Sequence, residues 1–137
     1  MGPNSAAIVR VYTREATGEI ADNTLDPSSD AVVVVDVEAG STVLGSGAKW
    51  QLGIVVKDLV AGTVIPFTLT PTPAINGSLS SAPWTTQSER FHYTIPAANL
   101  TAHKGNLCQI YGYLLIGTGA ANYDATFVES TPFLVLP

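Results

Sequence analysis

Two histidines and one cysteine are the first residues to test for chemistry, because nucleophilic catalysis needs a Ser or Cys beside an oriented base. His92 alternates with Arg90 along a predicted strand, His103 falls in a predicted corner loop, and no G-x-S-x-G turn is present. Both histidines are therefore interpreted as surface residues. A small hydrolase is the least favoured function, because it would require His92 or His103 to meet a carboxylate across strands.

Cys108 is the only cysteine, which excludes an intrachain disulfide. It lies among apolar residues of a predicted strand, where a buried thiol behaves as a small hydrophobic side chain. One buried cysteine and two separate histidines do not suit a zinc site. No metal or organic cofactor is expected.

Acidic residues are concentrated near the N-terminus, where the segment from Glu15 to Glu38 contains no Lys or Arg. Asp22, Asn23, Asp26 and Asp30 fall in one predicted loop and supply the oxygen ligands that Ca²⁺ prefers. Their spacing matches no standard calcium loop and lacks a terminal bidentate Glu. A solvated acidic loop is the favoured interpretation, and a weak calcium site is the alternative.

Aromatic residues suggest a carbohydrate-binding surface as an alternative function. Trp84 follows Pro83 in a long aperiodic loop, where an exposed indole could stack on a sugar ring. Tyr111 and Tyr113 share one strand face, and Tyr123 on the neighbouring strand could join them. The competing interpretation, which we favour, is that Trp84 folds back as a lid over one end of the domain.

The composition excludes several classes of partner. Charged residues make up 12% of the chain, against roughly 25% in an average soluble domain. The formal net charge is −5 with only six Lys and Arg, which argues against nucleic acid and against an anionic membrane surface. No signal peptide or membrane-spanning segment is recognised. The compartment stays open, although a weakly charged, Thr- and Ser-rich surface is typical of cell-surface, secreted or virion β-proteins and tolerates close self-contact.

The periodicity predicts an all-β domain spanning residues 1–137. Residues 106–116 (NLCQIYGYLLI) have strand character on both faces and are predicted to form a central strand. Other strands are predicted at 6–13, 31–38, 50–58, 63–70, 89–95 and 123–136, with one helical turn near 97–102. Seven or eight short strands with little or no helix predict an antiparallel Greek-key β-sandwich.

The segment from Asn99-Leu100 through Lys104-Gly105 to Leu107-Cys108 resembles the corner before the penultimate strand of immunoglobulin-like and fibronectin-like modules. Trp50, in a middle strand, is similar to the core tryptophan of that architecture. The resemblance covers about a third of the chain and implies an immunoglobulin-like or fibronectin-like strand arrangement. Leu107 replaces the corner tyrosine of those modules, and their disulfide pair is missing.

These observations favour a non-catalytic module with a structural, assembly or adhesion role. Residues 6–13 contain a single charge, Arg10, and a weakly guarded edge strand can pair with another chain. Val9, Val11 and Tyr12 are the predicted contact residues, together with Trp84 in its loop. The expected partner is protein, most simply another copy of this chain.

Overall fold

The computed structural model describes residues 5–18, 20–119 and 122–137, without the side chains of 118–123. The described residues form ten strands and two short helices. In chain order these are β1 (Ala6–Glu15), β2 (Thr24–Leu25), β3 (Ala31–Ala39), α1 (Ser41–Gly45), β4 (Lys49–Asp58), β5 (Thr68–Pro71), β6 (Asn76–Ser78), β7 (Ser88–Ile95), α2 (Ala97–Thr101), β8 (Leu107–Gly119), β9 (Asn122–Glu129) and β10 (Phe133–Val135). Neither helix is long enough or apolar enough to span a membrane.

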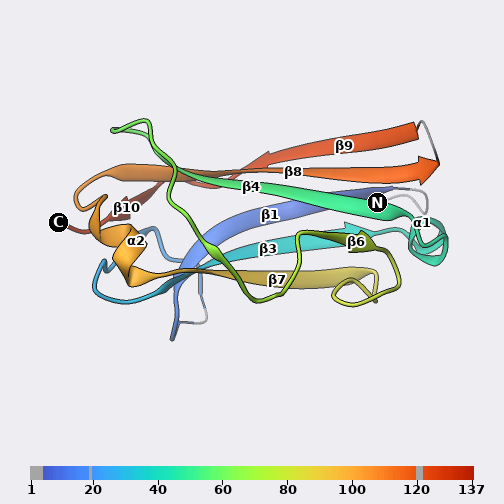
Figure 1. Ribbon diagram of the computed structural model, residues 1–137, viewed down its shortest axis with the longest axis horizontal. Helices are drawn as coiled ribbons and strands as arrows, with labels where there is room; N and C mark the ends of the chain where they lie inside the picture. Colours follow the sequence, from blue (N-terminus) through green and yellow to red (C-terminus); the bar gives the residue numbers. More distant parts are fainter. Residues whose placement is uncertain (1–4, 19, 120–121) are drawn as a thin grey trace.

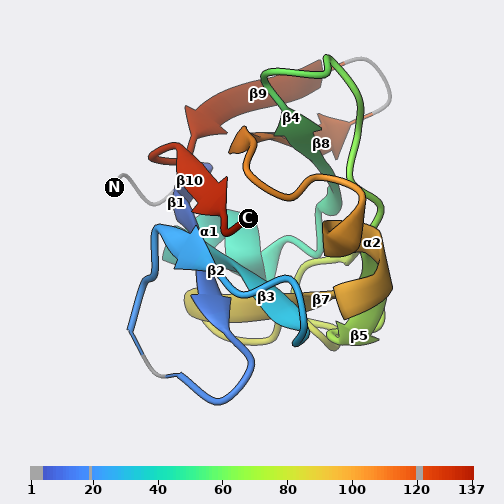
Figure 2. The same cartoon turned by 90° about the vertical axis from the view of Figure 1, so that its left-hand side faces the viewer.

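Two sheets pack face to face, which confirms the predicted all-β sandwich (Figure 1). Sheet A has the order β1-β3-β7-β5. Sheet B has the order β2-β10-β8-β4-β6, with β9 also paired to β8. Every pair is antiparallel except β2 with β10. Figure 2, which looks along the strands, separates the layer of β4, β8 and β9 from the layer of β1, β3 and β7.

The predicted central strand is confirmed as β8, which lies between β4 on one side and β9 on the other. Cys108, Ile110 and Leu114 point into the core and are buried. Burial, assisted by the nearby Asp58 carboxylate, raises the pKa of the Cys108 thiol to about 12. The thiol therefore stays protonated and unreactive at neutral pH, as a buried cysteine should.

The valine run of β3 is apolar on both faces because this strand is central in sheet A, between β1 and β7. Val34, on the outer face, lies between Tyr12 and His92 in register and is fully buried. Farther along the same face, Asp36 forms ion pairs with Arg10 at 2.8 Å and with Arg90 at 2.6 Å. This row of side chains covers the outer face of sheet A with polar groups.

The pattern predicted for the first strand is wrong beyond Ile8. The register of β1 against β3 shifts between Ile8 and Arg10, so that two β1 residues lie opposite one β3 residue. Such a bulge reverses the alternation of side chains that follow it. Val11 is consequently in the core at 4% exposure, whereas Val9 is 51% exposed. Val11 is therefore unavailable as a contact residue.

The strand predicted at 63–70 is in fact divided between the two sheets. Val64 forms a bridge with Lys57 of β4, and the Ile65 amide donates to the Val56 carbonyl. Thr68 already pairs with Thr94 of β7 in the other sheet. Pro66, at the crossing, has no amide hydrogen to contribute to either ladder. The predicted helical turn near 97–102 is confirmed as α2.

Candidate interaction surface

The structure buries Trp84 completely, as the favoured interpretation that it folds back onto the domain requires, and not as a contact residue in an exposed loop. Its ring meets Trp50 edge-on, with ring centroids 5.6 Å apart, and meets Phe91 at 5.8 Å. Trp50 in turn stacks on Phe91 at 5.5 Å. Trp84 therefore folds back into the core, and both proposals that required its exposure, a protein contact and a sugar platform, lose this residue.

The outer face of sheet B carries an apolar and aromatic surface that we call the apolar face. Register places its side chains side by side on β4, β8 and β9, since residues opposite one another on neighbouring strands share a face. The apolar face consists of Val55, Tyr111, Tyr113, Leu115 and Phe127. Its rim is polar and carries Gln51, Lys57, Gln109 and Glu129.

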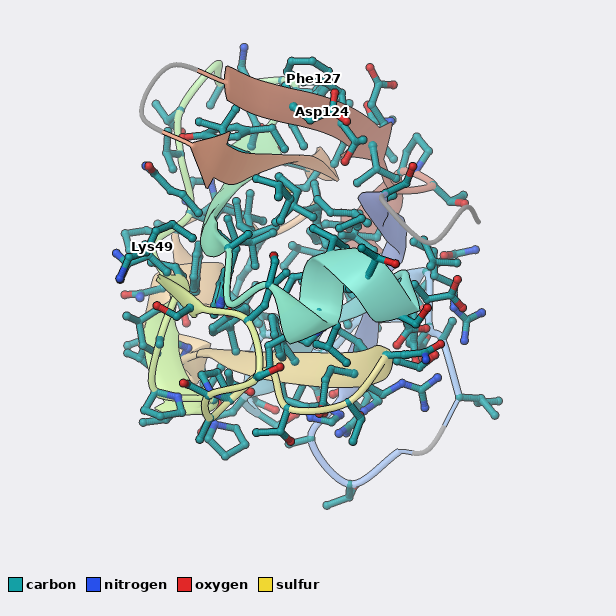
Figure 3. The ribbon with its side chains drawn as sticks, turned by 90° about the vertical axis from the view of Figure 1, so that its right-hand side faces the viewer. Lys49, Asp124 and Phe127 are labelled. Carbon is teal, nitrogen blue, oxygen red and sulfur yellow. The ribbon has the colours of Figure 1, made fainter. Side chains whose placement is uncertain are left out.

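Phe127 is the most exposed residue of this surface, with 78% of its area accessible to solvent. Figure 3 shows it above the β9 ribbon, pointing away from the sandwich interior. It lies opposite Tyr113 in the β8–β9 ladder, and it lines a shallow depression with Tyr111 and Glu129. Because Phe127 adjoins the half-buried Tyr111 and Tyr113, it belongs to a contiguous apolar patch, which makes this face the candidate interaction surface.

The sequence predicted the two tyrosines of this surface but not Phe127. Tyr111 and Tyr113 do share one face of β8, as predicted, and both are half-buried. The side chain of Tyr123 lies outside the described residues. Phe127 could have been identified only from the register of β9, because the sequence from Tyr123 to Leu136 does not show which residues oppose the tyrosines.

Gly53 shapes the apolar face, because the Tyr113 ring lies directly where a Cβ atom of residue 53 would project. Gly53→Ala is expected to displace the whole Tyr113 ring from this position, at a cost in stability of about 1–3 kcal/mol. The measurement is the NMR chemical shift of the Tyr113 ring protons. Gly45→Ala is the matched control, since nothing lies within 4 Å of its added Cβ. Unmoved Tyr113 signals in Gly53→Ala would contradict this account.

His103 was predicted to be a surface residue, but it is buried against a carboxylate from another part of the chain. Its Nδ1 lies 2.7 Å from Oδ2 of Asp58, which is fully buried. The same oxygen accepts from the Asn106 amide at 2.7 Å, and Oδ1 accepts from the backbone amides of Val60 and Ala61. All contacts of this carboxylate thus hold two turns together, one after β4 and one before β8.

A hydrolase would need a histidine–carboxylate pair of this kind. Here the groups around the pair are those of two turns, which its hydrogen bonds stabilise. The Asp58 carboxylate takes part in four hydrogen bonds. Among the described residues, no hydroxyl that could act as a nucleophile bonds to the His103 ring. His92 forms no carboxylate pair among the described residues. Its pKa is lowered by burial and by the nearby Arg14 and Arg90.

The candidate calcium loop is not supported, because its carboxylates are bonded separately. Asp22 accepts from the amide and hydroxyl of Thr24, Asp26 accepts from those of Ser28, and Asp30 accepts from the Ala97 amide. Within the described residues no group of three or more His, Cys, Asp or Glu side chains is placed to hold a metal ion. These acidic residues shape turns.

Comparison with known proteins identifies a fold and leaves the family open. No protein-family model matches the sequence, and no curated protein matches it. Among solved structures, the chain is similar to AggA, the major subunit of aggregative adherence fimbriae type I from Escherichia coli. The TM-score is 0.51 at 9% sequence identity, over 96% of both chains. The likeness extends over almost the whole molecule, and it shows that this chain shares the β-sandwich fold of that fimbrial subunit.

Proposed function

We propose that this chain is a non-catalytic β-sandwich module with a structural or assembly role, which acts by protein–protein contact through the apolar face of sheet B. The observation that carries the proposal is Phe127, which is 78% exposed on the edge strand β9 and lies beside Tyr113 in an apolar surface with a polar rim. Interaction surfaces typically have this arrangement, with aromatic residues at the centre and polar residues around them. The partner we propose is another copy of the chain.

Two further features support assembly over catalysis. The buried histidine–carboxylate pair is occupied by turn-stabilising hydrogen bonds. The structural neighbour is itself a major subunit of a fimbria, and the proposal extends an assembly role of that general kind to this chain. The exposed Val9 on β1 stays a secondary candidate contact.

The first test is the molar mass in solution, measured by size-exclusion chromatography with light scattering over a hundredfold range of concentration. We expect a defined oligomer for the wild type, and Phe127→Lys is expected to convert it to monomer by placing a charge at the centre of the contact. Val60→Lys is the matched control. Val60 is 69% exposed in the turn after β4, so this change should leave the mass unaltered. A wild-type monomer at every concentration would exclude self-assembly.

A carbohydrate-binding module is the second candidate, favoured by the position of the Tyr113 ring over Gly53 on an exposed face. The Tyr111 hydroxyl donates to Oε1 of Gln109 at 3.1 Å, which fixes a second ring beside it. Saturable glycan binding by a monomer, lost in Tyr113→Ala, would favour this function over assembly.

A further inference from the structure

We propose that β9 pairs antiparallel with β9 of a second copy of this chain, about a two-fold axis at Thr126. This inference rests on the proposed assembly function and specifies its geometry. Joining the two β9 edges would make one continuous sheet from the two copies of sheet B, with the apolar faces side by side. A two-fold axis requires this kind of self-complementary contact, in which each residue meets its own counterpart in reverse order.

The first argument is that β9 is the least protected strand edge in the described part of the chain. Each of the other edge strands has a feature that hinders pairing with another chain. Strand β1 has a bulge beside Arg10, and β5 contains Pro71. Strands β2 and β6 span only two and three residues. In contrast, β9 pairs only with β8, in unbroken register from Glu129 to Tyr123, and contains no Pro, Lys or Arg.

The second argument concerns which backbone groups are free. The Ser130 amide donates to the Ile110 carbonyl at 2.9 Å, so the backbone groups of Ser130 point toward β8. Successive residues of a strand direct their amide and carbonyl groups to opposite sides. In the continuous register that follows, Val128 and Thr126 also point toward β8. The groups of the alternate residues therefore point to the free edge: Ala125, Phe127 and Glu129.

This alternation restricts how two β9 edges can meet. Hydrogen bonding requires edge-facing residues to oppose edge-facing residues, so Ala125, Phe127 and Glu129 can pair only among themselves and with Tyr123 of the other copy. Asp124, which faces β8, can never lie opposite Glu129. The strand's two carboxylates are thereby kept out of direct opposition, which would cost stability in a symmetric pair.

A two-fold axis at Thr126 gives the most favourable pairing of side chains. It places Phe127 opposite the small Ala125 of the other copy, which leaves room for the ring on the apolar face. It also places the two Thr126 residues opposite each other, on the inner face of the sheet that they share with the core residue Leu114. The pairing also stays clear of the hairpin tip, where the register shifts between Gly117 and Gly119.

Cysteine cross-linking tests this arrangement, because a single introduced cysteine meets its own counterpart only at the axis. Opposed residues of this non-hydrogen-bonded kind have Cα atoms about 4.5 Å apart, which a disulfide can bridge. Under mild oxidation, we expect Thr126→Cys to form a covalent dimer. Ala125→Cys and Val9→Cys, on the same edge and on the β1 edge, should stay uncross-linked, as should the wild type with its buried Cys108. Cross-linking of either control in preference to Thr126→Cys would overturn the proposal.

Ala125→Pro gives an independent test. The Ala125 amide points to the free edge, so proline removes no bond to β8 but deletes two hydrogen bonds per dimer. Their loss should raise the dimer dissociation constant by roughly thirtyfold or more, while circular dichroism confirms the fold. If the wild type is monomeric throughout, the assembly function itself fails. If the wild type is oligomeric, Ala125→Pro does not weaken it and Thr126→Cys does not cross-link, only the β9 geometry fails.

Discussion

Trp84→Ala is expected to lower the free energy of unfolding by about 3–5 kcal/mol, the usual cost of truncating a fully buried tryptophan. The physical reason is the loss of edge-on contacts with Trp50 and Phe91, together with the cavity that the indole leaves between the sheets. A domain of this size has a total stability of about 5–15 kcal/mol. The variant should therefore be marginally folded, as measured by urea denaturation at neutral pH.

Trp84→Phe is the matched control. The Trp84 indole nitrogen is buried with no hydrogen-bond partner in the described residues. A phenylalanine therefore gives up no hydrogen bond and keeps most of the apolar volume, and its cost should be clearly smaller than that of alanine. The result that would contradict this account is a change of less than about 0.5 kcal/mol for Trp84→Ala, the value typical of a surface position.

The sequence was most informative where one local pattern could hold for a whole strand. Residues 106–116 are apolar in both of their alternating sets, which predicted a strand with a neighbour on each side, and β8 lies between β4 and β9. The run from Ala31 lacks alternation for the same reason, since β3 is central in sheet A. In these segments a central position in the sheet leaves a signal in every residue.

Prediction failed where a single residue changed the geometry. The bulge after Ile8 moved Val11 into the core. Isoleucine and valine are ordinary strand residues, so the sequence does not indicate a bulge at this point. The crossing at Pro66 divided one predicted strand between two sheets. His103 was misplaced because its partner Asp58 lies far away in sequence, and only the assembled fold brings them together.

The candidate surface illustrates the same limit. Its tyrosines were visible as a pair two residues apart on one strand. Phe127 belongs with them only through the pairing of β9 with β8, and the β9 edge is free only because no described strand pairs with it there. When a contact surface is built from several strands, the register of their pairing determines which side chains become neighbours. A single sequence does not specify that register.

Asp58→Ala is expected to cost about 3–5 kcal/mol, because it removes the charged partner of a buried cluster and leaves polar groups unpaired. The carboxylate lies between the turn after β4, whose Val60 and Ala61 amides it accepts, and the turn before β8, which holds His103 and Asn106. It therefore joins two turns in the region where Leu107 replaces the corner tyrosine of immunoglobulin-like modules.

The same cluster predicts a pH dependence. Burial alone would raise the pKa of Asp58, but hydrogen bonds from Ala61, Asn106, His103 and Val60 outweigh it and hold this pKa well below its ordinary value. Because the pKa is lower in the folded than in the unfolded chain, the stabilisation is complete above about pH 5 and declines as the pH falls further. At such pH the Asp58 carboxyl binds a proton in the unfolded chain but not in the folded chain, and this shifts the equilibrium toward unfolding.

Asp58→Asn separates this effect from other carboxylates, because it keeps the shape of the side chain and removes its titration. The pKa of Asp36 is also lowered, by its hydrogen bonds to Arg90 and Arg10 in opposition to burial, so the wild type should lose stability in acid for more than one reason. We expect the gap in unfolding free energy between wild type and Asp58→Asn to narrow from pH 6 to pH 3. A gap that stays constant would show that the Asp58 charge does not stabilise these turns.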